Sequence, residues 1–384
     1  IGGRRMSRGV FAEYAVDRPG RMDAGFFAAV MLLWGLGMVI LHVTSADYGL
    51  RWFDDSYYFL RRQFIYSAIG MAALVFLASI NISTTKRLLP LIVLGSLALC
   101  LLVFIPGIGA DRNDGVRRWI DLPFSATVQP SEFAKFAVIL FLSNFFAKEE
   151  TIAGESHGSI PILGVMTFVV IIFLQKDFST AAFILLLGAI QLFISGAQVA
   201  RIVAFSVLAI PASILFVFVE PYRVNRFIAF MNPDFDIHGL NFQTKAARDA
   251  ISAGGIFGEG IGAGLSRINR IPEVRSDYIF AGWTEAMGFI GVILYVILLG
   301  FFAWRGFSIA LRCGNLFGSM CAFGCTASIF LQSLVNCAVV AHALPSTGIP
   351  LPFWSSGGSS LISSFCMCGI VLQVSRIKSH EVTV

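Results

Sequence analysis

Charged residues are scarce in this chain. Only 13% of its 384 residues are Asp, Glu, Lys or Arg, whereas 57% are hydrophobic. Because soluble domains carry about 25% charged residues, this composition excludes an ordinary soluble globular protein and predicts a polytopic membrane protein. The formal net charge of +5 is too modest to predict a nucleic-acid partner. Basic residues beside a membrane more often meet lipid headgroups.

Cysteine pairs of the CxxC type are also missing. The seven cysteines fall mostly within apolar runs, and none has a histidine partner at metal-ligand spacing. We therefore interpret them as small buried hydrophobic residues rather than as a redox or metal site. The glycines from Gly254 to Gly264 lack the Gly-Lys-Ser/Thr ending and the βαβ setting of a nucleotide loop. They favour tight turns and close backbone approach instead, and no organic cofactor is expected.

Long hydrophobic runs, by contrast, are abundant. A membrane-spanning helix needs about 20 mostly apolar residues. The sequence offers ten candidates, at 24–45, 64–81, 88–106, 130–147, 159–174, 178–195, 201–220, 278–303, 315–341 and 358–375. This pattern predicts an all-α protein with a ten-helix membrane domain at 24–375, an N-terminal tail at 1–23 and a C-terminal tail at 376–384. The first run is typical of a spanning helix rather than of a cleaved signal peptide.

Lysines and arginines in the short loops favour an orientation with both tails in the cytoplasm, N-in and C-in. The long segment 221–277, between the seventh and eighth spans, then forms a large extracytoplasmic loop. Every unusual polar segment falls on that same side, namely 107–129, 175–177, 221–277 and 342–357. Their clustering predicts one composite site at the extracytoplasmic end of the bundle.

Asp277 is the most informative residue of that site. It follows Arg275 and Ser276 and stands at the mouth of the eighth predicted span. A carboxylate at membrane depth is costly and generally marks function, so Asp277 is a candidate general base. From the residues alone, a helix cap or an ion-pair partner of Arg275 explains it equally well.

Three more charged residues are predicted beside or within the bundle. Glu132 and Lys135 stand at i and i+3 at the start of the fourth span, so they share one helix face. The pair is either a structural ion pair that fixes helix packing or a polar floor beneath a headgroup site. Asp177 lies in the polar break between the fifth and sixth spans, where its side chain could cap the sixth helix.

Cationic side chains accompany these carboxylates. Arg117 and Arg118 flank Trp119, a pattern that fits interfacial anchoring and phosphate binding equally well. The spacing in 242–251 predicts a short amphipathic helix lying on the membrane. The candidates for contact with a pyrophosphate or headgroup are Arg223, Arg226, Lys245, Arg248, Arg275, Arg117 and Arg118.

A proline-rich return at 345–360 enters the tenth span. Three prolines within eight residues cannot continue a helix. Non-helical backbone at membrane depth is either packed in protein or lines a cavity, and we expect a cavity wall. Ser355 and Ser359 in this return are further candidates for the site.

Taken in order along the chain, several segments resemble the SEDS family (shape, elongation, division and sporulation), which includes FtsW and RodA. The matches, spread over about residues 24–375, are GVRRWI (115–120), QPSEFAK (129–135), QKDFSTA (175–181), FIAFMNPDFD (227–236) with SAGGIFGEGIGAG (252–264), PEVRSDYIF (272–280) with Glu285, and LPSTGIPLPFWSSGGSS (344–360). The chain departs from the family pattern at Lys176, where proline is more frequent, at Ser356, where tyrosine is usual, and at Arg275-Ser276, where His-Thr is common.

The resemblance implies a peptidoglycan glycosyltransferase of the bacterial cytoplasmic (inner) membrane. Such an enzyme polymerises lipid II into β-1,4 glycan strands on the extracytoplasmic face, together with a class B penicillin-binding transpeptidase and other divisome or elongasome membrane proteins. The resemblance also implies that Asp277 is the essential catalytic residue and that the Glu132/Lys135 pair is important. Asn336 and the overall sequence of the motifs favour the FtsW type, which acts at the septum, over the RodA type.

The expected reaction inverts the anomeric carbon of the donor and therefore needs one base. The pyrophosphate leaving group needs neutralisation by the cationic side chains or by a divalent cation, Mg²⁺ or Mn²⁺. If Asp277 is not the base, the other candidate carboxylates are Glu132, Asp177 and Glu285. Two other functions remain open. A lipid II flippase or other transporter would place charges through the membrane depth, and a non-catalytic divisome scaffold would depend on apolar helix faces.

Overall fold

The chain is described from a computed structural model. The described residues are 20–112, 116–123, 126–151, 160–195, 221–232, 241–263, 271 and 274–377, together with the single positions 203, 207 and 211. The tail predicted at 1–23, apart from its last four residues, and most of the seventh predicted span, 201–220, lie outside them.

Nine of the ten predicted spans coincide with helices of the described chain. These are α1 (Ala24–Phe53), α2 (Tyr58–Ser79), α3 (Ile82–Leu102), α4 (Pro130–Thr151), α5 (Ile160–Leu174), α6 (Phe178–Ile194), α11 (Ile279–Arg312), α12 (Leu316–Val340) and α13 (Gly358–Ser375). Seven of them are long and apolar enough to cross a membrane, whereas α5 and α6 are shorter apolar helices. The prediction of a mostly helical, polytopic membrane protein is therefore confirmed.

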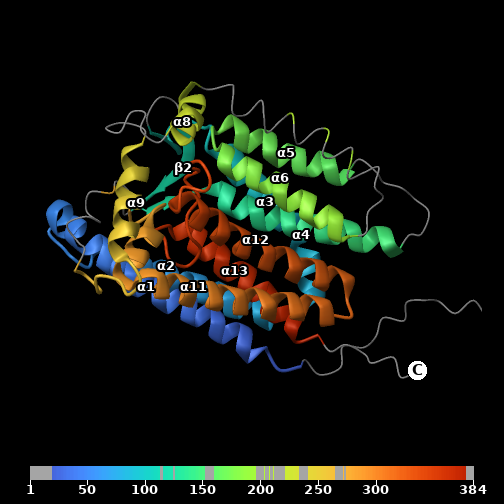
Figure 1. Ribbon diagram of the computed structural model, residues 1–384. Coiled ribbons are helices and arrows are strands. Elements are labelled where there is room, and N and C mark those ends of the chain that lie inside the picture. The colour runs from blue at the N-terminus through green and yellow to red at the C-terminus, as the bar shows by residue number, and fades with distance from the viewer. Residues whose placement is uncertain are drawn as a thin grey trace, which may run out of the picture.

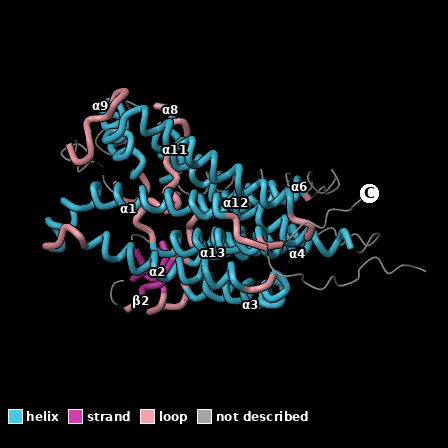
Figure 2. Tube along the Cα trace, turned by 90° about the horizontal axis from the view of Figure 1, so that it is seen from below, coloured by secondary structure: helices cyan, strands magenta, loops and turns pink. Residues whose placement is uncertain are grey.

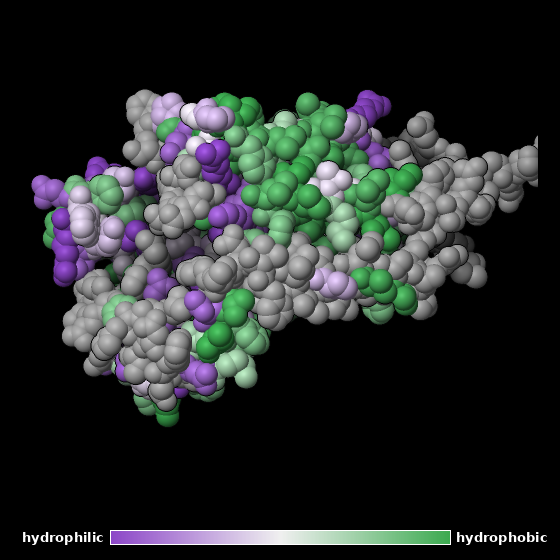
Figure 3. Space-filling model, turned by 90° about the horizontal axis from the view of Figure 1, so that it is seen from above, coloured by the Kyte–Doolittle hydropathy of each residue, from purple (hydrophilic) through white to green (hydrophobic). Residues whose placement is uncertain are grey.

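The long helices run side by side and share one polar end. Two further helices, α8 (Pro221–Met231) and α9 (Phe242–Gly254), lie at that end, and a small sheet lies at the same end on the other side of the bundle (Figures 1 and 2). Hydrophilic side chains gather there, and hydrophobic side chains cover the helices that lead away from it (Figure 3). Outward-facing leucines such as Leu91 and Leu94 on α3 belong to this apolar covering, which is the surface that a lipid-embedded bundle presents.

Helix α13 lies inside the bundle and packs closely on α2. Small residues permit this approach: a Cβ added to Gly70 would stand 2.5 Å from the ring of Phe365, and one added to Gly369 would stand 2.9 Å from the carbonyl oxygen of Leu74. Helices in lipid associate through such small-residue contacts because burial of apolar surface supplies little driving force there. Helix α13 thereby becomes a fixed support for the loop that precedes it.

The segment predicted as a loop at 107–129 contains a three-stranded antiparallel sheet. Its strands are β1 (Gly109–Arg112), β2 (Val116–Leu122) and β3 (Ala126–Val128), in the order β1-β2-β3. Ile120 pairs with Gly109 on one side and with Val128 on the other. β1 and β3 are short, and the seven residues of β2 (VRRWIDL) do not alternate between apolar and polar, so their pattern did not distinguish them from a loop.

Helix α9 confirms that 242–251 is helical, whereas its place on the membrane surface stays a prediction. Its small residues Ala247, Ala250 and Gly254 are buried, and a Cβ on Gly254 would stand 2.3 Å from the carbonyl oxygen of Thr284 in α11. The apolar face of α9 therefore packs on α11. Lys245 and Arg248 are exposed on the same helix.

Helix α11 is broken at Gly288, which has φ +62° and ψ −159°. The chain from 255 to 260 runs along this break and exchanges four backbone hydrogen bonds of 2.9–3.2 Å with residues 285–290. Its glycines make the contact possible, since a Cβ on Gly258 would stand 2.2 Å from the carbonyl oxygen of Ala286. The close backbone approach predicted for this glycine run is thus confirmed.

Candidate functional site

A proline-rich connection between α12 and α13, residues 345–357, forms the centre of the candidate site and is called the return loop below. It is not helical, as its three prolines predicted. The aromatic residues Phe353 and Trp354 are fully buried, and the Trp354 ring packs edge-on against Trp283 and Tyr295 of α11. This half of the return loop is packed in protein, so the expectation that it lines a cavity was wrong for it.

Asp277 lies in a turn, residues 274–278, that is bound directly to the return loop. The Ser356 N–H donates to the Arg275 carbonyl at 2.8 Å, and the Ser355 hydroxyl donates to the Ser276 carbonyl at 2.5 Å. Ser355 Oγ also accepts a 2.7 Å bond from the Leu351 N–H. These bonds make the turn and the return loop one unit, and they give the predicted site residue Ser355 a structural role.

The Asp277 carboxylate is partly exposed, and its neighbours are defined on two sides. The Ser276 hydroxyl donates to Oδ1 at 2.9 Å. On the other side, a Cβ built on Gly348 of the return loop would stand 3.4 Å from Oδ2. The N-cap position of α11 is held by Tyr278, so the alternative of Asp277 as the N-cap residue of its helix was wrong.

Arg226 approaches the return loop two residues from Gly348. Its guanidinium donates to the Ser346 carbonyl at 3.2 Å, and the same side chain lines a small surface pocket. Thr244 of α9 and His342 line this pocket as well. Burial, followed by the charge of Arg248, lowers the pKa of His342, so the positive charge beside this pocket comes from Arg226 and Arg248.

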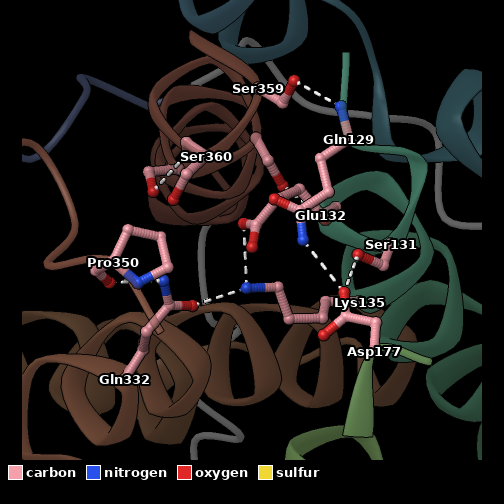
Figure 4. A network of polar contacts seen from close by, with 11 residues as sticks. Gln129, Ser131, Glu132, Lys135, Asp177, Gln332, Pro350, Ser359 and Ser360 are labelled. Atoms are coloured by element: carbon pink, nitrogen blue, oxygen red, sulfur yellow. Dashed lines mark hydrogen bonds and ion pairs between the residues drawn. The ribbon is translucent and has the colours of Figure 1, made fainter. Parts of the chain in front are cut away.

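A buried polar network supports the return loop from inside the bundle (Figure 4). Glu132 Oε2 and Lys135 Nζ form an ion pair at 2.8 Å, and both side chains are almost fully buried. Lys135 Nζ also donates to Gln332 Oε1 at 2.6 Å, and Gln332 Nε2 donates to the Pro350 carbonyl at 2.9 Å. The predicted pairing of Glu132 with Lys135 is confirmed, and the pair is linked to the return loop.

Asp177 occupies a different place from the one predicted. It stands at the N-cap position of α6, but its side chain makes no capping hydrogen bond. Instead, Oδ2 accepts bonds of 2.9 Å from Gln129 Nε2 and 2.8 Å from Ser131 Oγ, so Asp177 ties the start of α4 to that of α6 (Figure 4). The predicted capping role was therefore wrong. The carboxylate binds two side-chain donors at the start of α4 instead of the backbone of α6.

The other cationic candidates lie in several different settings. Arg118 of β2 donates to the Lys176 carbonyl and so joins the sheet to the α5–α6 break. Arg275 lies in an aromatic slot, with its guanidinium 3.9 Å from the ring centre of Tyr48 and 4.8 Å from that of Phe59. Arg117 is partly exposed on the same strand as Arg118. Of Arg223 only the backbone, within α8, is described.

Two further candidates are internal. Glu285 is fully buried in α11, three residues before the break at Gly288. Ser359 Oγ accepts a 2.9 Å bond from the Gln129 N–H, which joins α13 to the start of α4. The structure therefore brings Asp277, Ser355 and Arg226 to the return loop, and it places Glu132, Lys135, Asp177 and Ser359 in the network that supports this loop.

Three residues near the site were not predicted from the sequence: Gln332, Gly348 and His342. Asn336 was predicted only as a feature of the FtsW type. Asn336 Nδ2 donates to the carbonyls of Asp277 and Ile349 at 2.8 and 2.9 Å. The signal that could have found this residue is the pair of amides Gln332 and Asn336, at i and i+4 within an apolar span.

A divalent cation was one of two predicted ways to neutralise the pyrophosphate, the other being the cationic side chains. Within the described ranges, no group of three or more His, Cys, Asp or Glu side chains could hold a metal ion. Because Mg²⁺ is usually held by one or two carboxylates together with substrate phosphates, the cation stays a prediction. The chemistry of the described site consists of one partly exposed carboxylate and of cationic side chains, of which Arg226 is bound to the return loop.

Comparisons with known proteins concern the family and the fold of the chain. Residues 24–380 match the family described as cell cycle protein, which groups FtsW, RodA and SpoVE. Stage V sporulation protein E of Bacillus subtilis is 35% identical over 91% of this chain and 96% of its own length. A probable peptidoglycan glycosyltransferase FtsW of Geobacter sp. (strain M18) is 35% identical over 90% and 94%.

Two solved structures share the fold. A chain from a peptidoglycan synthase complex that coordinates polymerization and crosslinking has a TM-score of 0.74 and 26% identity, covering 92% of this chain and 98% of its own. The rod shape determining protein RodA of Thermus thermophilus has a TM-score of 0.68 and 25% identity, covering 92% and 97%. The chain therefore belongs to the FtsW/RodA/SpoVE family of multi-pass membrane proteins, as the resemblance of its motifs predicted.

Proposed function

We propose that this protein is a peptidoglycan glycosyltransferase that polymerises lipid II, with Asp277 as the general base. The observation that carries the proposal is the setting of Asp277: a partly exposed carboxylate, oriented by Ser276, that faces the bare backbone of Gly348. The relatives named as peptidoglycan glycosyltransferases support the same reaction.

In the proposed reaction, the 4-hydroxyl of an acceptor sugar attacks the anomeric carbon of the donor. The oxygen–carbon bond forms while the bond from carbon to pyrophosphate breaks, and the α-linked donor becomes a β-1,4 linkage. Inversion needs a base that removes the proton of the attacking hydroxyl. The Asp277 carboxylate accepts this proton in the step, and the Ser276 hydroxyl holds one of its oxygens in place.

Negative charge develops on the pyrophosphate as it leaves the sugar. Arg226 and Arg248 supply positive charge around the pocket beside Ser346. Lys245 is exposed on α9, as Arg248 is. Such charges stabilise a developing anion most when they are fixed before reaction. Arg226 meets this condition through its bond to the return loop.

The cellular setting completes the proposal. The polar end of the bundle faces outward from the bacterial cytoplasmic membrane, with both tails inside, so that the lipid tail of the substrate stays in the bilayer. A class B penicillin-binding transpeptidase is the proposed partner, which the similarity to a chain of a peptidoglycan synthase complex supports. Septal localisation follows if the division role suggested by the FtsW relatives holds.

The test is polymerisation of lipid II by the purified protein with its cognate transpeptidase. Asp277→Asn should lower the rate by about 10² to 10⁴-fold, because positioned base catalysis contributes that much. Asp249→Asn is the matched control, since Asp249 is exposed on α9. Wild-type polymerisation by Asp277→Asn would exclude Asp277 as the base. If the wild-type complex makes no polymer but moves lipid II across vesicles, the protein is a flippase instead.

A further inference from the structure

We infer that Asn336 is a positioning residue, which holds Asp277 and the return loop at the separation that catalysis requires. The inference rests on the proposed role of Asp277 as the base. It concerns a side chain that does not itself face the substrate, since Asn336 lies within α12 and is 1% exposed.

The geometry of one amide group carries the inference. Asn336 Nδ2 donates to the Asp277 carbonyl at 2.8 Å and to the Ile349 carbonyl at 2.9 Å. A side-chain amide nitrogen has two N–H groups. Asn336 therefore donates one hydrogen bond to each of two segments that are distant in sequence. Among the described residues, Asn336 Oδ1 accepts no hydrogen bond, so both hydrogen bonds described for this side chain are donations from Nδ2.

The two carbonyls belong to residues on either side of the space between the Asp277 carboxylate and Gly348. Ile349 follows Gly348, and the Gly348 backbone is the wall against which Asp277 Oδ2 lies. A change in the distance between the Asp277 and Ile349 carbonyls therefore moves the carboxylate relative to this wall. Because a misplacement of about 1 Å can reduce a rate about 10²-fold, the effect should appear in the chemical step.

The adjacent side chain on the same helix face strengthens this arrangement. Gln332, one turn before Asn336, holds the Pro350 carbonyl, and Lys135 in turn holds Gln332. Residues at i and i+4 share a helix face, so α12 fixes the neighbouring carbonyls of Ile349 and Pro350 together. Asn336 differs from Gln332 in that it also reaches Asp277.

The experiment measures kcat and KM for lipid II polymerisation by the complex with the transpeptidase. Asn336→Ala should lower kcat about 10²-fold and leave KM unchanged, because the base is misplaced while substrate contacts remain. Ser364→Ala is the control, since its buried hydroxyl bonds only to Ser360 of its own helix in the described contacts. It should retain wild-type kcat.

A second variant guards against a packing defect. Asn336→Asp keeps the shape of the side chain but removes both N–H donors. Its rate relative to wild type should rise as the pH falls, because the introduced carboxyl group regains one donor when it is protonated. Each rate is divided by the folded fraction of the same sample, because a buried carboxylate also lowers stability in a pH-dependent way. A role in packing alone then predicts a constant ratio.

Three results would overturn the inference. Asn336→Ala could keep the kcat of Ser364→Ala, it could raise KM alone, or both Asn336 variants could lose the folded peak in size-exclusion chromatography while Ser364→Ala keeps it. Asp277→Asn, measured alongside, distinguishes failure of the proposed base from failure of the inference about Asn336. If Asp277→Asn is inactive and Asn336→Ala is fully active, only the inference fails; if Asp277→Asn is active, the proposed base fails and the inference with it.

Discussion

Gly348 presents bare backbone to the carboxylate of Asp277. A Cβ on Gly348 would stand 3.4 Å from Asp277 Oδ2, and Gly348 has φ +72°. Glycine is required here twice: for the left-handed backbone conformation and for the open space beside the oxygen. An acceptor hydroxyl has to reach that oxygen, so the missing side chain is part of the proposed site.

Gly348→Ala should therefore reduce polymerisation more than it reduces stability. The left-handed backbone conformation costs an alanine about 1–2 kcal/mol, and the added methyl group also occupies the space beside the carboxylate. Gly107→Ala is the matched control, because Gly107 has φ +87° and nothing within 4 Å of an added Cβ. Both variants should lose similar thermal stability, whereas only Gly348→Ala should lose activity. Equal activities would contradict the proposed approach of substrate at Gly348.

The buried ion pair makes a prediction about stability. Lys135→Met leaves the Glu132 carboxylate in the bundle without the partner that it has at 2.8 Å. Removal of one member of a buried pair costs about 3–5 kcal/mol, because the remaining charge is uncompensated. Thermal unfolding in detergent should show this loss, and the double variant Glu132→Gln with Lys135→Met should recover part of it.

An exposed ion pair provides the control for this prediction. Arg51 and Asp47 lie at i and i+4 on α1, and the Arg51 side chain is 67% exposed. Arg51→Met should change stability by about 0–1 kcal/mol. A loss in Lys135→Met no larger than in Arg51→Met would show that Glu132 finds another partner or is neutral in the folded protein.

The sequence predicted those features that depend on local spacing. Long apolar runs placed the helices, and the i, i+3 separation of Glu132 and Lys135 predicted their pairing, because both follow from helix periodicity alone. The partners of Asp177 were missed, since Gln129 and Ser131 reach it from another helix. The hydrogen bonds of Asn336 were missed for the same reason: they join three segments whose approach only the fold defines.

His342 predicts a pH dependence of stability. Burial, followed by the charge of Arg248, lowers its pKa, and Arg226 lines the same pocket. The unfolded chain, with a histidine pKa of about 6.5, then binds the proton more readily than the folded protein. Stability is therefore lost as the pH falls below the unfolded value, and no further loss follows below the folded pKa.

His342→Gln should flatten this decline. The fall in melting temperature from about pH 7 to about pH 5 should be smaller in the variant than in the wild type, by a modest amount because the imidazole is partly solvated. Arg248→Gln should act in the same direction, because it removes a charge that opposes protonation of His342. An unchanged or steeper decline in His342→Gln would show that this imidazole does not titrate in the pocket as described.

Arg275 distinguishes a packing role from a substrate-binding role. Its guanidinium stacks on the ring of Tyr48 in α1, and its carbonyl is bound by the return loop, so we expect it to fix the turn that carries Asp277. Arg275→Lys and Tyr48→Leu should then each lower the melting temperature, with a coupling of about 0.5–2 kcal/mol in the double-mutant cycle. Arg61→Lys, at an exposed arginine paired with Asp55, should have no such coupling to Tyr48. If Arg275 instead binds the pyrophosphate, Arg275→Lys should raise KM, Tyr48→Leu should leave KM unchanged, and the two substitutions should act additively.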